Sequence, residues 1–148
     1  MNYRRTTVGL ISALTLFLLA STHLLASDSR QSLFVNLTSD NLDRAAMAIN
    51  FSTRVRQEKN IQVTLFLNVE GVRIADKRIP EKKHANGQSL KQMLNKFIQS
   101  GGKVIVCPMC MKNVAGMSKS DLVSGVVVGG SDITWPALFA ENTTVLSY

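Results

Sequence analysis

The sequence contains two cysteines, Cys107 and Cys110, which form a C-P-x-C motif. The β-branched apolar run at residues 104–106 directly precedes them and predicts a short strand buried on both faces. Pro108 cannot continue a central strand, but it fits the first turn of a helix, where its missing N–H is no loss. We therefore expect Cys107 where a strand ends and a helix begins, which is where open α/β sheets place reactive groups.

The start of such a helix would change the chemistry of the first cysteine. It carries partial positive charge and free N–H groups, and both favour a thiolate, the nucleophilic form of cysteine. The structural alternative is that both cysteines are small buried hydrophobic side chains, as free cysteines often are. The spacing, the preceding strand and the intervening proline favour the chemical interpretation, in which Cys107 is the nucleophile and Cys110 assists it.

Residues 1–26 have the pattern of a secretory signal peptide. Arg4 and Arg5 precede an uncharged stretch with an apolar centre at residues 8–20, and small residues follow. The apolar centre is shorter than the ~20 residues that span a bilayer, so an uncleaved membrane anchor is the less favoured alternative. The pattern predicts an exported, periplasmic protein whose mature domain covers residues 27–148 and has no membrane segment after cleavage.

Length and charge indicate one exported domain with a modest basic excess. The chain has 148 residues, enough for one domain with a real core. Its formal net charge is +7, and removing Arg4 and Arg5 leaves 15 of the 17 basic residues against 10 acidic ones, or +5. Export and the lack of a basic platform with interleaved aromatic residues argue against nucleic acid as a partner. An anionic sulfur species or an acidic protein fits better.

Apolar strands alternate with helical patterns along the mature chain. This alternation predicts an α/β fold of three layers, α/β/α, with helices on both faces of a parallel-type sheet. The clearest helix follows Ser89, which is expected to cap it with Gln92 at the capping-box position, and its apolar stripe, including Met93 and Phe97, is expected in the core. Strands are expected at residues 32–38, 61–68, 104–106, within 125–130 and at 143–147, and further helices at residues 40–59, 111–117 and 131–139.

The helix ends carry specific expectations. Asp40 is expected to cap the first helix through its carboxylate. Ser131 or Asp132 is expected to cap the last helix, with Pro136 in its first turn. Residues 69–76 are ambiguous between a loop and a short further strand.

Two polar segments lie outside these elements. Residues 77–87 are charged and contain a proline and a glycine, so they are expected to form a surface loop, although a loop of this length is sometimes a functional cover. Within it, His84 alone supports neither metal binding nor acid–base chemistry. The glycines at residues 129–130 allow close approach of a ligand or a neighbouring chain, but they lack the spacing of a nucleotide-binding loop.

The order of elements and several short segments resemble the DsrE/DsrF-like sulfur-relay family. The cysteine motif with its strand, at residues 102–110, is the sharpest part of the resemblance. It extends over the mature chain from about residue 33 and includes residues 71–75, 121–122, 126–128 and 145–148. The resemblance implies a five-stranded, mostly parallel sheet in an α/β domain, commonly assembled into trimers or hexamers. It also implies a carrier cysteine after the third strand, which is Cys107 here.

The resemblance further implies a function and partners. Characterised members accept sulfur from a donor protein as a cysteine persulfide and pass it to an acceptor protein. The best-known members are cytoplasmic, whereas this chain carries an export pattern. The favoured interpretation is a periplasmic sulfur carrier or sulfurtransferase in reduced-sulfur metabolism, with no resident cofactor or metal. In it, Cys107 is loaded, and Cys110, one helical turn further on, resolves the persulfide by forming a disulfide.

Three alternatives remain open. A thiol–disulfide redox protein would use the same C-P-x-C pair, but thioredoxin-like proteins place that pair early and need a later cis-proline loop, and only Pro136 follows here. A Cu(I) site would use Cys107, Met109, Cys110 and Met111, although the two methionines are better explained as core residues. The third alternative is a structural subunit without thiol chemistry. A purely structural disulfide is disfavoured because the loop between the cysteines is too small to constrain the fold.

Overall fold

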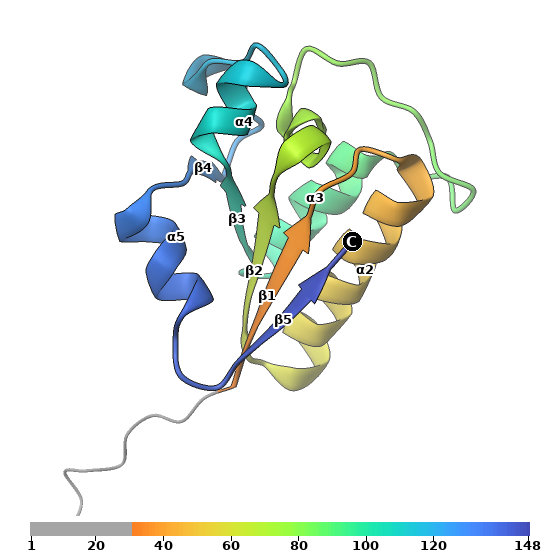
Figure 1. Cartoon of the computed structure of the whole chain (residues 1–148). Coiled ribbons are helices and arrows are strands. Elements are labelled where there is room, and N and C mark those ends of the chain that lie inside the picture. Colours follow the sequence, from red (N-terminus) through yellow and green to blue (C-terminus); the bar gives the residue numbers. More distant parts are fainter. Residues whose placement is uncertain (1–30) are drawn as a thin grey trace, which may run out of the picture.

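Five parallel strands form the centre of the structure, in the order β4-β3-β2-β1-β5 (Figure 1). The computed structural model describes residues 31–148, so the predicted signal peptide lies outside the described residues. The strands are β1 (Ser32–Leu37), β2 (Gln62–Leu67), β3 (Lys103–Val106), β4 (Val126–Val128) and β5 (Thr143–Ser147). The helices are α2 (Leu42–Lys59), α3 (Leu90–Gln99), α4 (Pro108–Asn113) and α5 (Ser131–Leu138), with 3₁₀ helices η1 (Val69–Ala75) and η2 (Lys119–Asp121). None of these helices is long and apolar enough to cross a membrane.

Every strand pair in the sheet is parallel, so the predicted α/β class is confirmed and the sheet is wholly rather than mostly parallel. The register aligns Val35 of β1 with Leu65 of β2, and Leu65 with Val104 of β3. Helices α2 and α3 lie together on one face, and α5 lies on the other (Figure 1). Because the strands are parallel, all their carboxyl ends meet at one edge of the sheet, where the loops gather.

The two faces of the sheet are packed differently. On the face covered by α2 and α3, the strand side chains form a hydrophobic core in which Met93 and Phe97 are buried, as predicted. On the α5 face, large apolar side chains remain in solvent: Trp135 is 60% exposed, Phe139 75% and Val145 50%. The α5 face is therefore only partly covered by its own chain.

The two long helices begin with side-chain caps. The capping box of Ser89 and Gln92 at the start of α3 is confirmed. At α2 the expected cap is wrong by one residue: Asn41 is the N-cap, and its Oδ1 accepts from the backbone N–H three residues on at 3.1 Å. Asp40 instead forms an ion pair with Arg73 at 3.2 Å. An asparagine caps as well as an aspartate, which leaves the carboxylate free for that pair.

Residues 69–75 form the 3₁₀ helix η1, so the expected loop or strand at residues 69–76 is wrong. The helix follows β2 directly, and its start is fixed by Asn68, whose side chain accepts from the N–H of Val69 at 2.9 Å. It packs so closely on the end of β1 that a Cβ at Gly71 would lie 2.2 Å from the carbonyl oxygen of Leu37. Only glycine fits this position, which brings η1 to the carboxyl edge of the sheet.

The segments after β3 agree with prediction in type but not in detail. Pro108 is the first residue of α4, as expected, and the helix ends at Asn113, so the expected span of residues 111–117 both begins and ends too late. Strand β4 lies where a buried strand was expected, yet Val127 is 39% exposed. The reason is its place at the edge of the sheet, where only one neighbouring strand covers it.

The last helix differs from prediction at both its cap and its proline. Gly130 is the N-cap residue of α5, and Ser131 is already helical, so neither Ser131 nor Asp132 caps it. Pro136 lies inside the helix rather than in its first turn. Because proline lacks an N–H, it removes one helical hydrogen bond in a helix that has no buried residues.

Candidate functional site

Cys107 lies at the junction of β3 and α4, where the sequence predicts it. Its backbone N–H donates to the carbonyl oxygen of Leu67 at 2.9 Å, which extends the β2–β3 ladder to the cysteine itself. The chain then turns into α4, and Cys107 is the N-cap residue. Its Sγ accepts from the backbone N–H of Cys110 at 3.5 Å. The half-buried thiol of Cys107 is thus held by regular structure on both sides.

Cys110 lies one helical turn further on, in different surroundings. Its S–H donates to Oδ1 of Asn68 at 3.1 Å. Burial raises the pKa of the Cys110 thiol, and the adjacent Cys107 side chain raises it further, against a lowering by the nearby N–H of Val69. Both cysteines are free thiols. The geometry therefore favours a neutral Cys110 that donates a hydrogen bond.

Asn68 is a residue of the site that sequence reasoning missed. Its Oδ1 accepts from Val69 N–H as well as from Cys110 Sγ, so one carbonyl oxygen joins η1 to the cysteine motif. Val69 has a φ of 48°, which is unusual for a β-branched residue. A signal was available: Asn68 follows β2 as Cys107 follows β3, and neighbouring parallel strands bring such residues together.

Comparison with protein families finds a match to the DsrE/DsrF-like family over residues 32–146. The chain belongs to this family. Its members are sulfur-relay proteins that often form oligomers, and the match includes the cysteine motif and all of the sheet except the last residue of β5. No curated protein sequence matches the chain.

Two solved structures have the same fold. The YchN protein of E. coli matches with a TM-score of 0.64 at 21% identity, over 80% of this chain and 99% of that one. MTH1491 of Methanobacterium thermoautotrophicum, a protein of unknown function, matches with a TM-score of 0.63 at 13% identity, over the same shares of the two chains. At these identities the likeness establishes the DsrE/DsrF-like fold alone.

The glycines after β4 complete this edge of the DsrE/DsrF-like sheet. The N–H of Gly129 donates to the carbonyl oxygen of Val106 at 2.8 Å, next to Cys107. A Cβ at Gly129 would lie 2.7 Å from Oγ1 of Thr134 and 3.0 Å from that carbonyl oxygen. The close approach at Gly129 is made by β3 and α5 of the same chain.

Met109, Met111 and His84 take no part in the hydrogen bonds of the two thiols described above. Met109 is 69% exposed, so the expectation that it fills the core is wrong, whereas Met111 packs against the core. His84 lies with Nε2 3.3 Å from Oδ1 of Asp43 on the surface. Within residues 31–148 no group of three or more His, Cys, Asp or Glu side chains has a metal-binding arrangement.

Proposed function

We propose that this DsrE/DsrF-like protein is an exported sulfur carrier that holds sulfane sulfur as a persulfide on Cys107. The observation that carries the proposal is the position of Cys107, a half-buried free thiol that caps α4 at the carboxyl edge of the sheet. The family assignment supports sulfur relay in general. The donor and the acceptor of sulfur are proposed to be proteins.

Loading would be a simple sulfur transfer. The Cys107 thiolate attacks the outer sulfur of a donor persulfide, the donor's S–S bond breaks, and the donor leaves as a thiol while Cys107 becomes the persulfide. Passing the sulfur on repeats the step, with an acceptor thiolate attacking the outer sulfur and Cys107 leaving as a thiolate. Each step breaks one S–S bond and forms another, so there is no net oxidation or reduction. The carrier therefore needs no redox cofactor.

Cys110 provides a second way to discharge the carrier. Its thiolate would attack the inner sulfur of the Cys107 persulfide, form the Cys107–Cys110 disulfide and release sulfide. A dithiol reductant is then needed to restore the two thiols. Since the raised pKa of Cys110 and its hydrogen bond to Asn68 keep the thiol neutral, this discharge is slow until the contact opens.

Intact-protein mass spectrometry without reductant, before and after polysulfide treatment, tests the proposal. We expect a mass gain of one sulfur atom that maps to Cys107 and is absent from Cys107→Ser. The Cys110→Ser variant should still be loaded. Two results would refute the carrier function. One is that no sulfur donor gives an adduct, and the other is that Cys107→Ser is loaded while Cys110→Ser is not.

A thiol–disulfide redox protein is the second candidate, favoured by the hydrogen bond that the N–H of Cys110 donates to Cys107 Sγ at 3.5 Å. Against it, Pro136 lies inside α5 and not in a loop facing the cysteines, so a thioredoxin-like site is not formed. The same spectra distinguish the two candidates. Loss of two hydrogen atoms, unaffected by polysulfide, would favour redox exchange.

Export and cleavage of the signal peptide are part of the proposal. They rest on the residue pattern of the first 26 residues. Cell fractionation and N-terminal sequencing test them: a periplasmic protein beginning near residue 27 is expected. Recovery of the intact N-terminus in the membrane fraction would favour the uncleaved anchor.

We also propose a homo-oligomer, a trimer or a hexamer, in which the α5 face is covered. Its support is the exposed apolar side chains of Trp135, Phe139 and Val145, together with the frequent oligomers of the family. Light scattering should give an oligomer for the wild type and a smaller species for Phe139→Ser. A monomer at all concentrations would contradict the proposal.

A further inference from the structure

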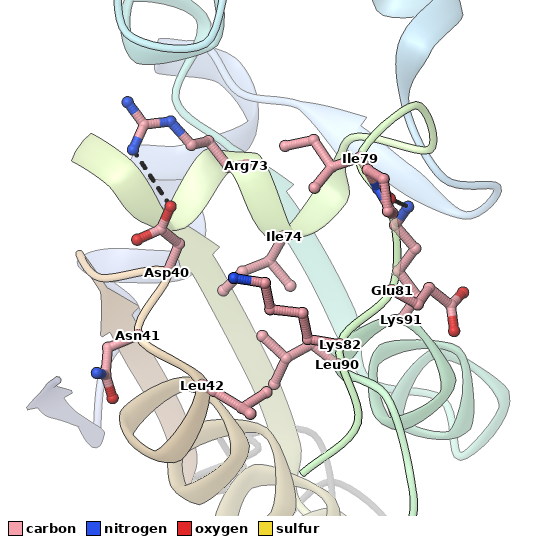
Figure 2. A pocket seen from close by; sticks show the side chains of 11 residues that line it. Asp40, Asn41, Leu42, Arg73, Ile74, Ile79, Glu81, Lys82, Leu90 and Lys91 are labelled. Carbon is pink, nitrogen blue, oxygen red and sulfur yellow. Dashed lines mark hydrogen bonds and ion pairs between the residues drawn. The ribbon is translucent and has the colours of Figure 1, made fainter.

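We propose that a cavity on the far side of η1 from the cysteines binds a small organic anion with an apolar body, such as a carboxylate or a sulfonate. The cavity has a volume of about 370 Å³ and lies at the carboxyl edge of the sheet (Figure 2). The turn after β1, helix η1, the loop at residues 77–87 and the first turn of α3 surround it. This inference does not depend on the persulfide chemistry of Cys107.

The walls of the cavity explain the apolar body. They are formed by the aliphatic side chains of Leu42, Ile74, Ile79 and Leu90 with the ring of Pro80. Figure 2 shows the four aliphatic side chains lying around one space. The volume falls at the lower end of the range for small-molecule sites. A ligand with a short hydrocarbon part would remove these side chains from water.

Two helix starts add positive potential. Leu42 and Leu90 are the first residues of α2 and α3, and both line the cavity. The N-terminal ends of these helices, of 18 and 10 residues, therefore border the same space. Each carries partial positive charge and favours an anion nearby.

The charged side chains that line the cavity also favour an anion. Three basic residues, Arg73, Lys82 and Lys91, line the cavity with two acidic ones, Asp40 and Glu81. Both carboxylates are already engaged, because Asp40 pairs with Arg73 at 3.2 Å and Glu81 accepts from the hydroxyl of Ser89.

Lys82 is the cation available to a ligand. It forms no ion pair with a carboxylate in the part of the chain that the structure describes. Figure 2 shows its side chain reaching across the cavity, whereas the ammonium group of Lys91 donates to the carbonyl oxygen of Ile79. An anion in the cavity would meet Lys82 without displacing an existing partner.

The loop at residues 77–87 is held in place as one wall. At its start, Arg78 pairs with Asp76 at 2.8 Å and with Asp121 at 3.4 Å. At its end, the N–H of His84 donates to the carbonyl oxygen of Gln88 at 2.9 Å. The loop that the sequence leaves open as a functional cover thus forms a fixed wall of a cavity.

Methyl NMR of the full chain tests the site with probes of one size. We expect hexanoate to shift the methyl signals of Leu42, Ile74 and Leu90, and hexylamine and 1-hexanol to bind more weakly. Lys82→Gln should weaken hexanoate binding by about fivefold, the size expected of one exposed ion pair. The matched control is Lys83→Gln, a neighbouring exposed lysine that does not line the cavity and should bind hexanoate as the wild type does.

Three outcomes would overturn the inference. The first is that hexanoate leaves these methyl groups unshifted, or shifts only the exposed α5 face. The second is equal binding of the acid, the amine and the alcohol, which would show that charge plays no part. The third is binding of inorganic sulfate as tight as that of hexanoate, which would show that the cavity does not recognise an apolar body.

Discussion

The surroundings of the two cysteines differ, although one helical turn separates them. Cys107 is fixed by its own element, because it continues the β3 ladder, caps α4 and accepts a backbone hydrogen bond. Cys110 is fixed by a distant one, because its thiol donates to Asn68 at the end of β2. The Cys107 thiol is therefore positioned by backbone structure, and the Cys110 thiol is restrained by one side chain. A single substitution can remove that restraint.

The largest expected effect separates the two thiols by their roles in sulfur release. A Cys110→Ser variant loaded with polysulfide should release sulfide at least about 100-fold more slowly than the wild type, because a hydroxyl does not supply the attacking thiolate. Methylene-blue detection of sulfide after loading and desalting measures the rate. The control is transfer to a small acceptor thiol, which should be unchanged. Equal sulfide release from both proteins would mean that the two cysteines do not act as a pair.

The second prediction concerns pH. In Cys107→Ser, where Cys110 is the remaining thiol, alkylation by iodoacetamide should need a higher pH in the folded protein than in guanidinium, because burial raises the pKa of Cys110. Mass spectrometry of the alkylated fraction over a pH series gives both curves. Coincident curves would show that the folded structure does not restrain this thiol.

The same raised pKa has a consequence for stability, with a definite sign. The unfolded chain gives up the Cys110 proton at lower pH than the folded chain does. The stabilisation is therefore complete below the ordinary thiol pKa and is lost as pH rises through the raised one. Denaturant unfolding should show this alkaline loss in the wild type but a weaker one in Cys110→Ala.

A smaller effect is expected when the restraint itself is removed. Asn68→Ala takes away the acceptor of the Cys110 thiol, so we expect alkylation of Cys110 to become about threefold to tenfold faster, as for the loss of one hydrogen bond. Asn60→Ala, at the far end of α2, is the matched control and should leave the rate unchanged. A slower reaction in Asn68→Ala would show that Asn68 activates the thiol rather than restraining it.

The smallest effect is expected at Val69. Its φ of 48° is unfavourable for a β-branched side chain, so Val69→Asn should raise the free energy of unfolding by about 0.5–1 kcal/mol. Val114, whose φ is −96°, provides the control, and Val114→Asn should give no gain. If the Val69 variant is less stable, the contacts of the valine side chain outweigh the backbone strain that asparagine relieves.

How far these surroundings follow from sequence differs between the two thiols. The place of Cys107 was predictable because local residues decide it: a buried β-branched run sets the strand, and Pro108 sets the start of the helix. The partner of Cys110 was missed because Asn68 lies 42 residues earlier, and finding it requires the pairing of β2 with β3 in addition to the local pattern. A local sequence pattern predicts where a strand or a helix forms. It does not predict which side chain a neighbouring element places against it.

The rest of the fold follows the same rule. Five strands and the capping box at Ser89 were predicted from short-range patterns. The errors at Asp40 and Pro136 arose where two neighbouring residues suit the same cap, or where no burial pattern fixes the helix. The cavity beside η1 was not foreseen as a cavity, because its walls form only where residues 40–42 meet residues 73–91 in the folded chain.

The position of β5 beside β1 affects the timing of folding. The hydroxyls of Ser32 and Thr143 lie 2.6 Å apart, yet 111 residues separate them along the chain. A nascent chain lacks β5 until residue 147 has been added, so β1 keeps an open edge until then, and a pairing over so large a sequence separation forms late. The five-stranded sheet is therefore complete only once β5 has been synthesised and has paired with β1.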